Sequence, residues 1–152
     1  MNNLSLQRES IEPRLDGIQK ELLLLGEFSQ LPFDEFQKPV VFDRAQLHLR
    51  FVLEGIFHIG SHILSRIPGG RFTEYKEIAR RLGETGIVSE EFAEKKLVPM
   101  AGYRNRLTHF YAEITDIEMY QILHDHLEDI REFLRAIKML MVDPQKFGLR
   151  LE

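Results

Sequence analysis

In the first half of the chain, apolar side chains recur at alternating steps of three and four residues, and this spacing predicts helices with one buried face. The first helix is expected to have Ser10 as its N-cap and Pro13 in its first turn. The second is expected to begin at Asp43, whose spacing to Gln46 is that of a capping box, and to stop before Pro68. The two apolar stripes are Ile11, Leu15, Ile18, Leu22 and Leu25, followed by Val52, Ile56, Ile59 and Ile63.

The sequence pattern in the middle of the chain predicts shorter helices. Residues 29–41 contain two prolines and are expected to form a connection with room for one helical turn. A short helix over residues 73–82 should end at Gly83, a residue type that favours the left-handed C-terminal cap. Ser89 should cap the next helix, which Pro99 should kink or split.

The clearest helical pattern lies near the C-terminus. Thr115 and Glu118 have the spacing of a capping box, and the apolar stripe that follows over residues 120–141 is unbroken. No segment alternates with a period of two for long enough to predict a strand. We therefore expect an all-α fold, an antiparallel helical bundle of four to five helices that forms a single domain over residues 1–152.

The composition limits the class of protein and its expected location in the cell. Of the 152 residues, 43% are hydrophobic and none is cysteine, which fits a globular domain and excludes disulfides and thiolate chemistry. The N-terminus lacks the pattern of a signal peptide and no apolar stretch approaches the ~20 residues that span a bilayer, so a cytoplasmic protein with no membrane contact is expected. The net charge of −4 argues against broad electrostatic binding of nucleic acid. Any RNA contact should be local, near Lys95-Lys96 or Arg104 and Arg106.

Reactive groups are concentrated in one segment, residues 102–111. It carries the guanidinium groups of Arg104 and Arg106, the Asn105 amide, the His109 imidazole and the Tyr111 phenol. A histidine with a pKa near ~6.5 can exchange protons at neutral pH, and arginine stabilises charge on phosphate oxygens. These groups can split a phosphodiester beside a ribose 2′-hydroxyl, with no metal and no cofactor required.

Helical geometry complicates this site. Arg104 and His109 are five residues apart, so an ideal helix would place them about 140° apart on its surface. Either the helix loosens after Leu107 and lets His109 swing back, or two chains contribute to one site. Arg104, Thr108 and Tyr111 do share a stripe. A two-fold dimer that pairs this helix with its copy would bring both sets of groups into one cleft.

The string RNRLTHFY over residues 104–111 resembles the Arg-x4-His signature of HEPN domains, and its longer form Arg-Asn-x-x-x-His-x-Tyr resembles the HepT branch of toxins. Residues 54–65 and 86–102 also resemble that branch. The resemblance implies an all-helical homodimer that cleaves RNA without metal and is neutralised by an MntA-like nucleotidyltransferase antitoxin. By position, it implies that Arg104 and His109 are catalytic and that Asn105 and Arg106 support RNA binding. Tyr111 would accept AMP from the antitoxin.

The sequence departs from the family at one position. Many relatives carry an acidic residue on the long second helix where this chain has His58, which could take part in acid–base work or simply pack. His58 and His62 are four residues apart and could chelate a metal, but no third ligand is evident. His124 and His126 face different ways. Gly69-Gly70 lacks the lysine of a phosphate loop and predicts a turn.

Two functions stay open at this point. One is the RNA-cleaving toxin. The other is a non-catalytic helical dimer that binds nucleotide or a nucleotidyltransferase partner, with Arg104 bonded to terminal carbonyls or to a carboxylate of a neighbouring helix and Tyr111 packed in the core. A nucleotidyltransferase reading frame beside this one would favour the toxin.

Overall fold

The computed structural model describes residues 5–69, 72–109 and 114–152, and its architecture is almost entirely helical. In chain order the elements are β1 (Ser5–Leu6), α1 (Arg8–Ser29), α2 (Phe33–Phe36), α3 (Pro39–Ser65), α4 (Tyr75–Glu84), α5 (Glu90–Phe92), the π-helical turn η1 (Ala93–Leu97), α6 (Val98–Thr108), α7 (Asp116–Asp125), α8 (Leu127–Val142), the 3-10 turn η2 (Pro144–Phe147) and β2 (Arg150–Leu151).

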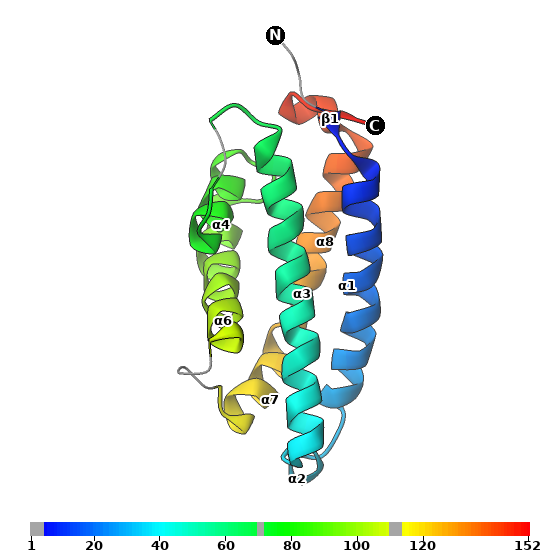
Figure 1. The fold of residues 1–152 in the computed structure, drawn as a ribbon, viewed down its shortest axis with the longest axis vertical. Coiled ribbons are helices and arrows are strands. Elements are labelled where there is room, and N and C mark those ends of the chain that lie inside the picture. The colour runs from blue at the N-terminus through cyan, green and yellow to red at the C-terminus, as the bar shows by residue number, and fades with distance from the viewer. Residues whose placement is uncertain (1–4, 70–71, 110–113) are drawn as a thin grey trace.

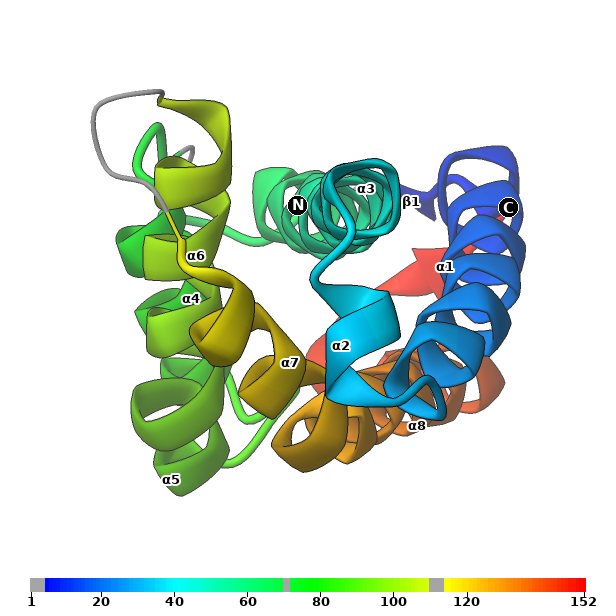
Figure 2. The same ribbon diagram turned by 90° about the horizontal axis from the view of Figure 1, so that it is seen from below.

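The long helices form an antiparallel bundle, as expected. In Figure 1, α1 runs from the top to the bottom, α3 returns beside it, α6 runs down again and α8 returns to the top. Seen from below in Figure 2, α3 lies between α1 on one side and α4 and α6 on the other. The long helix α3 therefore contacts both halves of the bundle, and α6 packs against α3, α4 and the π-helical turn.

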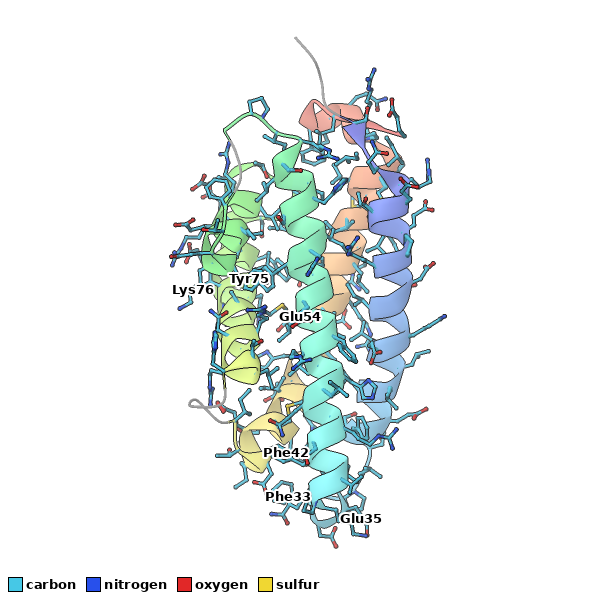
Figure 3. The ribbon with its side chains drawn as sticks, in the orientation of Figure 1. Phe33, Glu35, Phe42, Glu54, Tyr75 and Lys76 are labelled. Atoms are coloured by element: carbon cyan, nitrogen blue, oxygen red, sulfur yellow. The ribbon has the colours of Figure 1, made fainter. Side chains whose placement is uncertain are left out.

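The predicted apolar stripes form the core. Every member of the α1 and α3 stripes is buried, and the α7–α8 stripe is buried except for the partly exposed Tyr120 and Met141. At the α2 end, Tyr120 contacts the rings of Phe33 and Phe36 at 5.1 and 5.0 Å and donates a hydrogen bond to the Leu31 carbonyl. Aromatic packing thus closes this end of the bundle, where Figure 3 labels Phe33. None of the helices that the structure describes combines the length and apolarity needed to cross a membrane.

Two predicted helix starts were wrong. Helix α1 begins at Arg8, after the N-cap Gln7, so Ser10 lies inside its first turn. Helix α3 begins at Pro39, four residues before Asp43. Proline suits the first turn of a helix because its φ is already helical and its missing N–H would have no partner there.

The predicted end of α4 was also wrong, because Gly83 lies within the helix and is needed there for packing. A Cβ at Gly83 would lie 2.7 Å from the Cβ of Ala93, which real Cβ atoms do not tolerate. The left-handed residue that follows the helix is Gly86, with φ of +80°. The absence of a side chain at Gly83 allows α4 to approach the segment that leads into α6.

That segment starts as predicted and then changes its winding. The Ser89 hydroxyl accepts a hydrogen bond from the backbone N–H of Phe92, which confirms the predicted cap. The chain then forms the π-helical turn Ala93–Leu97 before α6, whose second residue is Pro99. Proline cannot donate its backbone N–H, so the split expected at Pro99 takes the form of a widened turn just before it.

The last predicted helix is divided in two at His126, whose φ and ψ of −122° and 0° are not helical. The His126 ring bonds to Asp129 at 2.9 Å, and Lys96 Nζ lies 3.6 Å from the same carboxylate. A buried acidic group at the break thus joins α8 to the π-helical turn. Because of this break and the short helices α2 and α5, the bundle has more helical segments than the four to five expected.

A short strand pair, which the sequence did not predict, joins the two ends of the chain. Strands β1 and β2 are parallel, with Ser5 opposite Arg150 and Leu6 opposite Leu151. The Arg150 Nε donates to the Ser5 hydroxyl at 2.8 Å. Strands of two residues are too short for an alternating pattern to be detected.

Candidate active site

The described part of the predicted reactive segment, residues 102–109, comprises the C-terminal end of α6 and the residue that follows it. Arg104 and Asn105 lie in its last two turns, and His109 is the residue at which the helix ends. His109 has an extended backbone (φ −105°, ψ 117°), while its N–H still bonds to the Asn105 carbonyl at 3.0 Å. The helix therefore ends before His109. The ideal-helix angle between Arg104 and His109 does not apply.

Arg104 projects toward α3 and α4. Its guanidinium carbon lies 4.2 Å from the centre of the Tyr75 ring, and its Nη2 lies 4.0 Å from Glu54 Oε1. Figure 3 labels Tyr75 and Glu54, which come from α4 and α3. The Arg104 Nη1 also donates to the Asn105 side-chain oxygen at 3.4 Å. An aromatic face, a carboxylate and an amide thus orient this guanidinium group.

The contacts of Arg104 leave part of its hydrogen-bonding capacity unused. Its side chain is 19% exposed, and its Nε is buried with no acceptor among the residues that the structure describes. The 4.0 Å separation from Glu54 is that of an ion pair rather than a hydrogen bond. A donor that is buried without an acceptor is unfavourable, so Arg104 is better suited to receive an anion than to act as a finished structural bridge.

Helix α3 supplies the acidic group of the site, although not from the position that the family resemblance considered. His58 is exposed, and Glu54 lies one turn earlier on the same face of α3. The contact of Tyr75 with Arg104 was likewise not predicted, because nothing in the sequence marks Tyr75 as a partner of an arginine. Both residues could have been found only by knowing how α3, α4 and α6 are rotated against one another.

Arg106 has a different environment from Arg104. Its Nη2 and Nη1 donate to the two oxygens of Glu118 at 2.6 and 2.9 Å. These hydrogen bonds raise the pKa of Arg106, and they join the end of α6 to the first turn of α7. The Thr115 hydroxyl accepts from the Glu118 N–H at 3.1 Å, so half of the predicted capping box is present while the Glu118 carboxylate binds Arg106 instead.

The remaining histidines are not gathered into a metal site. Among the described residues, no group of three or more His, Asp or Glu side chains could hold a metal ion. The His62 Nε2 accepts a hydrogen bond from the Gln7 backbone N–H at 3.1 Å, and burial lowers the pKa of His62. Tyr111, the expected AMP acceptor, lies outside the described residues.

Fold and site together define a class of protein: an antiparallel helical bundle that carries an Arg-x4-His pair at the C-terminal end of α6. Comparison with known families agrees, because the family model described as ribonuclease HepT-like matches residues 18–137. The chain belongs to this HepT-like family. The resemblance to HEPN toxins that the reactive segment suggested is thereby confirmed.

Individual relatives support the same placement. The tRNA nuclease HepT of Aphanizomenon flos-aquae (strain 2012/KM1/D3) is 27% identical over 136 residues, which cover 87% of this chain and 90% of that protein. A toxin–antitoxin complex with AMP-PNP contains a chain that matches with a TM-score of 0.78 at 20% identity, over 87% of this chain and 99% of that one. The tri-AMPylated Shewanella oneidensis HEPN toxin in complex with MNT antitoxin matches with a TM-score of 0.79 at 21% identity, over 87% and 98%. At these identities the structural matches establish the fold.

Proposed function

We propose that this protein is a ribonuclease toxin that cleaves RNA without a metal ion, with Arg104 and His109 as its catalytic residues. The observation that carries the proposal is the end of α6. There Arg104, whose buried Nε has no acceptor among the described residues, is followed by the exposed His109 just beyond the helix. Membership of the HepT-like family supports it. Because a curated relative is a tRNA nuclease, we propose tRNA as the substrate class.

The chemistry requires two proton transfers and one centre of positive charge. The ribose 2′-hydroxyl oxygen forms a bond to phosphorus while the bond to the 5′ oxygen breaks, giving a cyclic phosphate and a free 5′-hydroxyl. Arg104 would stabilise the negative charge on the phosphate oxygens. His109 would exchange a proton with either the attacking or the leaving oxygen, because an imidazole can act as a general acid or base.

A second copy of the chain would supply the other proton-transfer group, and we therefore propose a homodimer. Leu47 and Phe51 of α3 are 41% and 43% exposed, on the helix that also carries Glu54. Pairing about a two-fold axis at this face would cover these apolar side chains and bring two copies of the site together. Sedimentation should then give about twice 17.9 kDa, and a monomer at tens of micromolar would contradict the shared site.

Regulation would follow from a nucleotidyltransferase antitoxin of the kind that the MNT antitoxin in the neighbouring complex represents. We propose that it transfers AMP to the hydroxyl of Tyr111, two residues after His109. An added phosphate next to the site would repel the RNA backbone and occupy the groups that bind it. Asn105, which already accepts a hydrogen bond from Arg104, would hold that guanidinium group in place.

The test is regulated expression of the protein, with growth and tRNA integrity followed over time, and cleavage by the purified protein in excess EDTA. His109→Ala and Arg104→Ala should each reduce cleavage by about 10² to 10⁴ and abolish toxicity. His124→Ala, in which an exposed histidine of α7 is lost, is the matched control and should behave as the parent. Tyr111→Phe should cleave RNA but resist neutralisation by the nucleotidyltransferase.

Each arm can contradict a separate part of the proposal. If His109→Ala and Arg104→Ala retain cleavage, the assignment of these two residues as catalytic is wrong. If they lose cleavage but melt many degrees below the parent, their role is structural and the non-catalytic dimer is the better description. Loss of cleavage in EDTA that a divalent ion restores would contradict metal independence. AMP mass on Tyr111→Phe after reaction with the antitoxin would place the modification elsewhere.

A further inference from the structure

Glu54 lies between two arginines, not one. Its Oε1 is 4.0 Å from Arg104 Nη2 and also 3.6 Å from the Nε of Arg50, which precedes it by one turn of α3. Because both distances end at the same oxygen, the two guanidinium nitrogens lie within about 7.6 Å of each other. A single phosphate group, with oxygens that point in several directions, can contact two donors at such a separation.

Arg50 and Arg104 share a second property. Within the described part of the chain, the Nε atoms of these two residues are buried and have no hydrogen-bond acceptor, and no other buried side-chain nitrogen or oxygen there is in this condition. Buried donors are almost always paired, so two unpaired donors on either side of one carboxylate indicate that an acceptor is missing from the site. The Arg50–Glu54 contact is four residues along one helix, but its 3.6 Å separation does not supply the hydrogen bond.

Charge and packing favour an anionic acceptor. The two guanidinium groups carry two positive charges against the single negative charge of Glu54, in a protein whose net charge is −4. Arg104 lies over Tyr75 at 4.2 Å and Arg50 lies near the ring of Phe51 at 5.9 Å. Neither aromatic contact supplies an oxygen acceptor for the guanidinium N–H groups.

We infer that Arg50 is a second phosphate-binding residue of this site, which binds the RNA backbone together with Arg104. In the absence of RNA, Glu54 holds the two guanidinium groups by weak ion pairing. When a phosphate enters, its oxygens accept from both arginines and replace the carboxylate as their main acceptor. This inference rests on the proposed function, because it names a further contact to the same substrate.

The experiment measures binding separately from cleavage. The probe is a fluorescent single-stranded oligoribonucleotide with 2′-O-methyl groups, which cannot be cleaved because the attacking hydroxyl is blocked. Its affinity is measured by anisotropy from 50 to 200 mM salt for the parent and for Arg50→Gln, Arg50→Lys and Glu54→Gln. The matched control is Arg44→Gln, which removes the same charge from an exposed position of the same helix.

We expect Arg50→Gln to weaken binding by about tenfold and to reduce the slope of log affinity against log salt by about 0.7, the value for one lost phosphate contact to a single strand. Arg50→Lys should restore the slope and only part of the affinity, because an ammonium group keeps the charge but not the fork of donors. Glu54→Gln should bind more tightly than the parent, since it removes the competing carboxylate. Arg44→Gln should change the slope much less than Arg50→Gln.

With a cleavable RNA, Arg50→Gln should raise KM more than it lowers kcat, because its contact is made before the chemical step. Equal slopes for Arg50→Gln and Arg44→Gln, or weaker binding by Glu54→Gln, would overturn the inference. If the parent cleaves RNA but Arg50→Gln binds as the parent does, the proposed function stands and Arg50 is only half of a helix ion pair. If the parent binds the probe with the expected Arg50 dependence but does not cleave tRNA, the anion site stands and the ribonuclease proposal fails.

Discussion

The ion pair between Arg106 and Glu118 allows a structural role to be separated from RNA binding by measurement. Its two hydrogen bonds of 2.6 and 2.9 Å are bidentate, but the side chains are 35% and 31% exposed, so water and salt screen the pair. Exposed pairs contribute about 0.2 to 1 kcal/mol, and bidentate geometry places this one near the upper value. For a chain of this length, about 1 kcal/mol corresponds to about 2 to 4 °C in Tm.

The assay is a double-mutant cycle in urea, with Arg106→Ala, Glu118→Ala and the combined variant. We expect a coupling energy of about 1 kcal/mol that decreases as salt rises. A coupling below about 0.3 kcal/mol would refute the reasoning from geometry.

The RNA contact of Arg106 remains a prediction that the same proteins test. If Arg106 binds RNA, Arg106→Ala should weaken binding of the uncleavable probe and Glu118→Ala should strengthen it, since the carboxylate would no longer compete.

Two further predictions concern stability. Gly83→Ala should lower the free energy of unfolding by about 1 to 3 kcal/mol, because the new Cβ would lie 2.7 Å from that of Ala93. Gly17→Ala in the exposed part of α1 meets nothing within 4 Å and should raise the free energy of unfolding by about 0.5 to 1 kcal/mol. Urea denaturation in which both variants shift the same way would contradict this packing. Burial, followed by the charges of nearby arginines, lowers the pKa of His62 in the folded protein. The stability contributed by neutral His62 is therefore fully present above the unfolded pKa of ~6.5 and is lost as pH falls through the folded pKa. His62→Gln should flatten the dependence of the urea midpoint on pH below ~6.5. An unchanged slope would exclude His62 as the cause of this pH dependence.

The sequence was most informative where burial alone determines structure. The stripes of α1 and α3 follow from apolar spacing, because a helix that must bury one face repeats with the period of the helix. The ends of the elements were less predictable, since several residue types can begin or end a helix. At Gly83, local preference indicates a helix end, but the close approach of Ala93 requires a glycine inside the helix. Tertiary packing decided that position, and no local pattern reports it.

The same distinction explains how much of the site could be predicted. Arg104, Asn105 and His109 could be proposed from the sequence because they are close together in the chain and their chemistry is recognisable in one short string. Glu54 and Tyr75 are distant in sequence from Arg104, and they reach it only because three helices pack with particular rotations.

Arg50 needed one step more, because its spacing from Glu54 is that of an ordinary helix ion pair and suggests no function. The distinguishing observation is the donor that this pair leaves unsatisfied, which exists only once the positions of Glu54 and Arg104 are known. Charged pairs at four-residue spacing are common on helix surfaces, and their exposed donors are satisfied by water. The buried Nε of Arg50 has no such acceptor, which is why the Arg50–Glu54 pair points to a ligand and the other four-residue ion pairs among the described residues do not.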